Sequence, residues 1–148
     1  MDTIEDHPFE TRTILIATAL ASVLAAQAAL AEVGASERAA IEAVIRAQMA
    51  AFARDDGEAA FAHASADIHA LFQTADAFMA MVRSGYQPVY RPRQVDFLEA
   101  IEGAGGPAQK VFVVGPDGAA YLAIYPMERQ PDGSWKIDGC YLARPDMS

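Results

Sequence analysis

The segment GYQPVYRPRQ, residues 85–94, carries the densest group of side chains that could bind a ligand. Tyr86 and Tyr90 flank a proline, and Arg91 and Arg93 would point the same way on an extended chain. Two arginines so placed could hold a carboxylate through forked hydrogen bonds, beside a wall of two phenol rings. The alternative is structural: the prolines stiffen the passage from helix to sheet, the tyrosines fill the edge of the core, and the arginines neutralise acidic neighbours.

An aspartate beside a tyrosine is the second pattern with chemical meaning, because a hydrolase or isomerase needs a base next to an acid or an oxyanion donor. Asp96 and Asp138 are the candidate carboxylates, although both are expected to face solvent from predicted strands. The candidate phenols are Tyr86, Tyr90, Tyr121 and Tyr125. The chain contains no G-x-S-x-G, H-E-x-x-H or glycine-rich phosphate-loop motif that would favour another chemistry.

His63, Asp67 and His69 form the one group with residue types typical of a metal site. On one continuous helix His69 would lie about 120° from the other two, so a tight site needs a break near Ser65. The alternative is two surface histidines with a capping aspartate, and we predict neither a metal nor a cofactor. The single cysteine, Cys140, cannot form an internal disulfide and is expected to be a buried, inert thiol.

An uncharged stretch near the start of the chain, residues 14–31, resembles the apolar part of an export signal. Its strongly apolar part is 11 residues, and Ala29-Leu30-Ala31 is an A-x-A cleavage pattern before Glu32. The acidic first twelve residues do not fit a basic n-region, and an uncleaved membrane anchor is the alternative. We expect residues 1–31 to be a cleaved signal peptide, residues 36–146 to be one domain, and the protein to be periplasmic or secreted without a stable membrane anchor.

Charge excludes one class of partner. The whole chain has a net charge of −9, and residues 32–148 carry 10 basic and 16 acidic residues, for a net charge of −6. Because phosphate binding needs clustered cationic side chains, we predict no nucleic-acid partner.

The first half of the expected domain has helical periodicity. Ser36 is a natural N-cap for a helix over residues 36–56, whose apolar face repeats at helical spacing from Ile41 to Phe52. A shorter, alanine-rich helix begins at residue 58 and is expected to end near Ser65. Thr74 caps a third helix that ends at Gly85.

The second half alternates with the period of strands. Four apolar runs lie within residues 94–102, 108–114, 119–129 and 134–144. Two Pro-Asp-Gly sequences, at 116–118 and 131–133, join the last three runs and favour tight turns. Helices followed by strands predict an α+β fold in which N-terminal helices pack on a curved, antiparallel, four-stranded sheet.

Residues 39–142 resemble a family of small exported bacterial proteins, domain of unknown function 4864. The resemblance rests on FMAMVRSGYQPVYRPRQVDF, residues 78–97, and GSWKIDGCYL, residues 133–142. The layout is also similar to the cystatin-like and nuclear-transport-factor-2-like (SnoaL-like) cone. That likeness implies helices packed into the concave face of the sheet, a pocket at the wide end, pairing of two copies through the sheet, and in some isomerases an Asp–Tyr pair. The residues expected to bind a ligand are Phe78, Tyr86, Tyr90, Arg91, Arg93 and Trp135.

Function stays open between three classes. The leading interpretation is a non-enzymatic module that binds a small molecule or a protein, with a homodimer expected from the fold. The alternatives are a small cofactor-independent isomerase or hydrolase, and a structural assembly protein. An interior filled by Phe78, Met81, Phe97 and Trp135 would favour assembly. An open cavity with a partnered Asp facing a tyrosine would favour the enzyme, and one without such a pair would favour binding.

Overall fold

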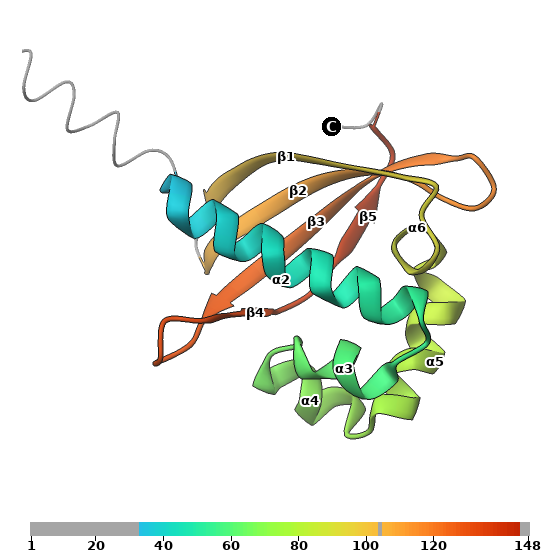
Figure 1. The fold of residues 1–148 in the computed structure, drawn as a ribbon, viewed down its shortest axis with the longest axis horizontal. Coiled ribbons are helices and arrows are strands. Elements are labelled where there is room, and N and C mark those ends of the chain that lie inside the picture. Colours follow the sequence, from blue (N-terminus) through green and yellow to red (C-terminus); the bar gives the residue numbers. More distant parts are fainter. Residues whose placement is uncertain (1–32, 104, 146–148) are drawn as a thin grey trace, which may run out of the picture. The chain divides into compact units, whose positions relative to one another are not determined.

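The helices come first in the chain and the strands follow, as the sequence predicts. In residues 33–103 and 105–145, which a computed structural model describes, five helices precede five antiparallel strands (Figure 1). The predicted α+β fold is therefore confirmed. A compact unit begins at Val33. That residues 36–146 form one domain stays a prediction. The predicted signal peptide, residues 1–31, lies outside the described residues.

The long helix α2, Ala35–Ala53, packs along the sheet. Its buried residues recur at helical spacing, among them Ile41, Ile45 and Phe52, which confirms the predicted apolar face. The predicted N-cap is wrong: Gly34 precedes the helix and no side chain caps it, so Ser36 lies inside the first turn. Among the described residues no helix has the length and apolar character that crossing a membrane requires.

The alanine-rich segment forms two helices instead of one. Helix α3, Gly57–Ala62, is capped by Asp56, and helix α4, Ala66–Phe72, is capped by Ser65. Helix α5, Ala75–Gly85, begins at the predicted Thr74 cap. A further short helix, α6, Gln87–Tyr90, replaces the extended passage that the two prolines suggested. Pro88 is tolerated there because the first turn of a helix does not use its N–H groups. The prediction of three helices was thus too low.

The sheet is an antiparallel meander with a divided last strand. Strands β1, Gln94–Gly103, β2, Gly106–Val114, and β3, Ala120–Arg129, pair in order. Strands β4, Trp135–Ile137, and β5, Tyr141–Ala143, both pair with β3, at its opposite ends. The break faces Pro126 of β3, whose carbonyl accepts a bond from the Asp138 N–H at 2.8 Å. Because proline has no N–H to donate, the hydrogen-bond ladder between β3 and the last strand is interrupted at Pro126. The single strand predicted within residues 134–144 is therefore divided into β4 and β5.

A bulge in β1 contributes to the bend of the sheet. Its register against β2 shifts between Phe97 and Ala100, which places two residues of β1 opposite one of β2. Gln109 of β2, 1% exposed, fills this irregularity: its Nε2 donates to the Leu98 carbonyl at 2.9 Å. Bulges increase local twist and bend a strand, so a buried amide here supports the curvature that the fold requires.

Two hydrophobic clusters hold the layers together. One lies between α2 and the sheet and includes Ile45, Val111, Tyr125 and Trp135. The other lies among the helices, where Phe52, Phe61, Phe72 and Phe78 meet with ring centroids 5.1–6.3 Å apart. Tyr86 packs against both clusters. A cavity opens where the two clusters meet.

Candidate functional site

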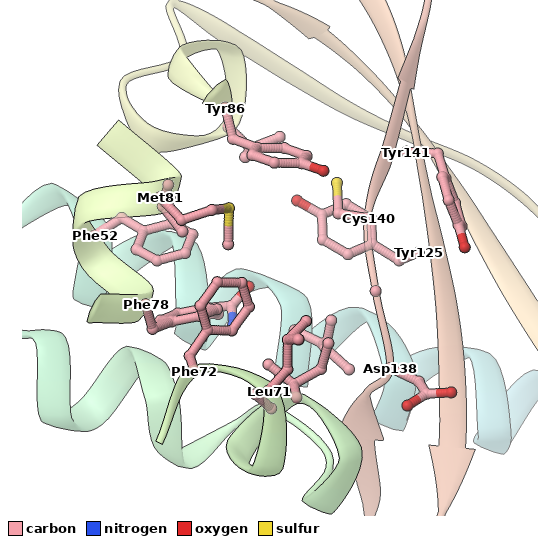
Figure 2. Close-up of a pocket in the computed structure, with 17 residues that line it drawn as sticks. Phe52, Leu71, Phe72, Phe78, Met81, Tyr86, Tyr125, Asp138, Cys140 and Tyr141 are labelled. Atoms are coloured by element: carbon pink, nitrogen blue, oxygen red, sulfur yellow. The ribbon is translucent and has the colours of Figure 1, made fainter. Parts of the chain in front are cut away.

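The cavity has a volume of about 380 Å³ and lies between helices α2, α4 and α5 and the segment that joins β4 to β5 (Figure 2). Its size falls at the lower end of the range for small-molecule pockets. The wall is mostly aromatic and aliphatic, and its residues include Phe52, Phe72, Phe78, Met81, Tyr86 and Tyr125. A structural assembly protein was expected to fill this interior with Phe78, Met81, Phe97 and Trp135. The interior is instead an open cavity, and Phe97 and Trp135 are not among the residues that line it.

Tyr125 places a polar atom at the inner end of the cavity. The residue is 1% exposed, and its hydroxyl has no oxygen or nitrogen partner among the described residues; its polar neighbour is the Cys140 thiol, a weak hydrogen-bonding group. Figure 2 shows the Tyr125 hydroxyl, the Tyr86 hydroxyl and the Cys140 sulfur pointing toward one another. A buried polar atom without a partner costs free energy, so this arrangement is an unfilled hydrogen-bonding site.

The hydroxyls of Tyr86 and Tyr125 and the thiol of Cys140 are all protonated at neutral pH. Burial raises the pKa of the Cys140 thiol to about 12, although the neighbouring Tyr125 hydroxyl opposes the rise. Burial also raises the pKa of Tyr125 well above its ordinary value, and that of Tyr86 less strongly. The inner end of the cavity is therefore uncharged. A thiol with so high a pKa is a poor nucleophile, in keeping with the inert role expected of Cys140.

The Asp–Tyr pair considered from the sequence does not converge on one point. Asp138 lines the cavity, but Figure 2 shows its carboxylate turned away from Tyr86 and Tyr125. The Ser65 hydroxyl donates to Asp138 Oδ1 at 2.6 Å. The other candidate carboxylate, Asp96, is exposed on β1, as expected, and accepts from Gln94 at 2.6 Å. Asp138 lies at the break between β4 and β5, where the residue as a whole is half-buried and its carboxylate lies with those of Asp67 and Glu128.

Ser65 connects the helices to the sheet beside the cavity. Its N–H donates to the Ile137 carbonyl at 2.9 Å, and the Ile137 N–H donates to the His63 carbonyl at 2.8 Å. Its hydroxyl accepts from the Ile68 N–H while donating to Asp138. One fully buried serine thus caps α4 and holds the end of β4.

Replacing Ser65 by Ala is expected to lower the free energy of unfolding by about 1–3 kcal/mol, because it removes a helix cap and leaves Asp138 without its donor. Urea unfolding measures the change. Ser84→Ala is the matched control, since the Ser84 hydroxyl bonds only to the Met81 carbonyl on an exposed part of α5. Equal stability of the two variants would show that the bond to Asp138 does not hold the helices on the sheet.

Two residues of the segment 85–94, Tyr90 and Arg91, form a cluster around Asp55. Asp55 was not identified as their partner from the sequence. The Tyr90 hydroxyl and Arg91 Nη2 both donate to the Asp55 carboxylate, the second at 3.0 Å. Arg83 Nε donates to the Tyr90 hydroxyl at 3.3 Å. The hydrogen bond from Tyr90 is the main reason that the pKa of Asp55 lies below its ordinary value. These contacts favour the structural interpretation of Tyr90 and Arg91.

The structure separates the six predicted binding residues. Phe78 and Tyr86 line the cavity. Tyr90 and Arg91 lie in the cluster around Asp55, and the Arg93 N–H donates to the Val114 carbonyl at the start of β1. Trp135 is buried between α2 and the sheet. That any of the six contacts a ligand stays a prediction. The alternation of residues 121–127 along β3 was the pattern that could have placed Tyr125 on the inner face.

The candidate metal-ligating residues His63, Asp67 and His69 do not form a group among the described residues. His69 Nε2 lies 2.7 Å from the Phe61 carbonyl oxygen, and its ring stacks on Phe61 with centroids 3.7 Å apart. Asp67 lies instead near Glu128 and Asp138, with carboxylate oxygens within 4.8 Å of one another. Exposed acidic groups often meet in this way, and the cluster alone defines no metal site.

The fold and the cavity define a class: a small α+β domain in which helices and a curved sheet enclose an apolar pocket with an uncharged polar end. The chain belongs to the family described as Domain of unknown function (DUF4864), whose model matches residues 34–148. The family expected from the sequence is thereby confirmed. No curated protein and no solved structure matches the chain.

Proposed function

We propose that this domain is a binding module that holds one small, mainly apolar molecule in the cavity between its helices and its sheet. The observation that carries the proposal is an open cavity of about 380 Å³ whose inner end presents the unpartnered hydroxyl of Tyr125. A stable interior is normally close-packed, and its buried polar groups are normally paired. A ligand that fills the space and contacts the hydroxyl would satisfy both conditions.

The mouth of the cavity supports the same conclusion. Leu71 is 71% exposed and Tyr141 is 64% exposed, and both line the cavity. Large apolar side chains left exposed at the edge of a cavity can contact a ligand as it enters. An apolar ligand would contact these side chains on entry and continue along the phenylalanines of the wall.

We further propose that the curved sheet and its helices form a nuclear-transport-factor-2-like cone, on the basis of the element order and the position of the cavity. The periplasmic or secreted location and the homodimer expected from the sequence stay predictions. The enzyme alternative has no specific support here, because the candidate carboxylates do not face the candidate phenols.

Titration of the full chain with N-phenyl-1-naphthylamine, an uncharged fluorescent probe, tests the proposal. We expect saturable binding at one site per chain. Met81→Trp should weaken that binding at least about tenfold, because the larger side chain fills the cavity from α5. Ser84→Trp is the matched control, since it adds the same ring to an exposed position of the same helix outside the cavity lining.

Thermal unfolding of both variants shows whether they remain folded. Absence of saturable binding to the wild type would contradict the proposal, as would a folded Met81→Trp variant that binds the probe as tightly as the wild type does.

A further inference from the structure

We propose that the natural ligand is an uncharged molecule whose apolar body ends in a hydrogen-bond acceptor of the carbonyl type, and that Tyr125 and Tyr86 donate to this oxygen. The inference rests on the proposed binding function and names the chemical class of the ligand. Three observations carry it: the unpartnered inner hydroxyl, the convergence of donor groups on one point, and the distribution of charge around the cavity.

The first observation concerns Tyr125 itself. Its hydroxyl is buried in a wall of side chains and finds no oxygen or nitrogen partner among the described residues, only the weakly bonding Cys140 thiol beside it. In other buried positions of this molecule the polar side chains are paired: Gln48 and Gln109 donate to backbone carbonyls, and Ser65 donates to Asp138. The Tyr125 hydroxyl is the exception, and it belongs to a residue that lines the cavity, where a ligand can reach it.

The second observation concerns the kind of group that fits. The Tyr125 hydroxyl, the Tyr86 hydroxyl and the Cys140 thiol point toward one another in Figure 2, and each carries a proton to donate. A ligand group that only donates could bond to a phenol oxygen but would accept none of these protons. A carbonyl oxygen has two lone pairs and no proton, so it complements two phenols at once.

The third observation concerns charge. Among the described residues that line the cavity there is no Lys and no Arg. Arg91 lies outside the cavity lining and is paired with Asp55 at 3.0 Å. A carboxylate at the inner end would lose its hydration without gaining a cation. A cation would meet no facing carboxylate, because Asp138 is turned away and bonded to Ser65.

A matched set of three ligands tests this inference on the full chain. 2-Acetylnaphthalene offers a ketone, 2-isopropylnaphthalene has the same shape without the oxygen, and 2-naphthoate carries a negative charge. Their affinities are measured by displacement of N-phenyl-1-naphthylamine and by calorimetry. We expect the ketone to bind at least about tenfold more tightly than the hydrocarbon, and at least about tenfold more tightly than the carboxylate.

Two variants assign the preference to the tyrosines. Tyr125→Phe is expected to reduce the ketone-to-hydrocarbon affinity ratio to about three, the preference that Tyr86 still supplies, and Tyr86→Phe is expected to reduce the wild-type ratio about threefold. Tyr121→Phe, four residues before Tyr125 along β3 and outside the cavity lining, is the control and should keep the wild-type ratio.

The possible outcomes separate the two proposals. Equal affinity for the ketone and the hydrocarbon, an unchanged ratio in Tyr125→Phe, or tightest binding of 2-naphthoate would overturn the inference while leaving a binding cavity in place. Failure of every ligand and of the fluorescent probe to bind would overturn the proposed function itself.

Discussion

Replacing Phe78 by Ala is expected to lower the free energy of unfolding by about 3–5 kcal/mol, the cost typical of removing a buried ring from a core. Phe78 is 6% exposed and contacts the rings of Phe52, Phe61 and Phe72, with centroids 5.1–6.3 Å apart. Its loss would join a new void to the cavity that Phe78 already lines. Chemical denaturation followed by circular dichroism measures the change.

Leu71→Ala provides the control for Phe78→Ala. Leu71 lines the same cavity but is 71% exposed, so its truncation should cost less than about 1 kcal/mol. If both substitutions cost the same, the aromatic cluster does not form the core that positions α4 and α5 around the cavity.

Alkaline pH is expected to destabilise the protein through Cys140. Burial raises the pKa of this thiol from an ordinary value of 9.0 to about 12 in the folded chain. Above pH 9 the unfolded chain loses the proton while the folded chain keeps it, so the free energy of unfolding falls as pH rises toward 12. The contribution is fully present below pH 9, and about 3 kcal/mol of it should be lost by pH 11.

Urea unfolding of the wild type and of Cys140→Ala at pH 8 and pH 11 isolates this contribution. Tyr125, whose pKa is also raised by burial, weakens the fold in the same direction in both proteins, so only the difference between them reports on Cys140. The wild type should lose about 3 kcal/mol more than the variant between the two pH values. Parallel losses would mean that the thiol ionises equally well in the folded chain.

Local chemistry explains which elements could be predicted. The Thr74 cap, the end of α5 at Gly85 and the Pro-Asp-Gly turns each depend on a few neighbouring residues, and all are present in the structure. Gly118 and Gly133 adopt φ of 84° and 88°, which favours glycine at these turn positions. The alternation of β2 and β3 likewise requires only the two-residue period of a strand.

Contacts between distant residues explain what could not be predicted. The sequence predicts that the alanine-rich helix ends near Ser65, but not that the Ser65 hydroxyl bonds to Asp138, 73 positions away. The role of Tyr90 depends on Asp55, 35 positions away. The division of the last strand follows from Pro126 on its neighbour. Composition and periodicity carry no information about such pairings. The sequence therefore could not show that only Phe78 and Tyr86, of the six predicted binding residues, line the cavity.

The central claim is that the cavity between the helices and the sheet binds an uncharged ligand through Tyr125. The most direct measurement is a crystal structure of the full chain with 2-acetylnaphthalene. The account predicts the naphthalene rings among Phe52, Phe72 and Phe78 and the ketone oxygen within hydrogen-bond distance of the Tyr125 hydroxyl. A crystal in which side chains close the cavity, or in which the molecule binds only on the outer surface, would contradict it.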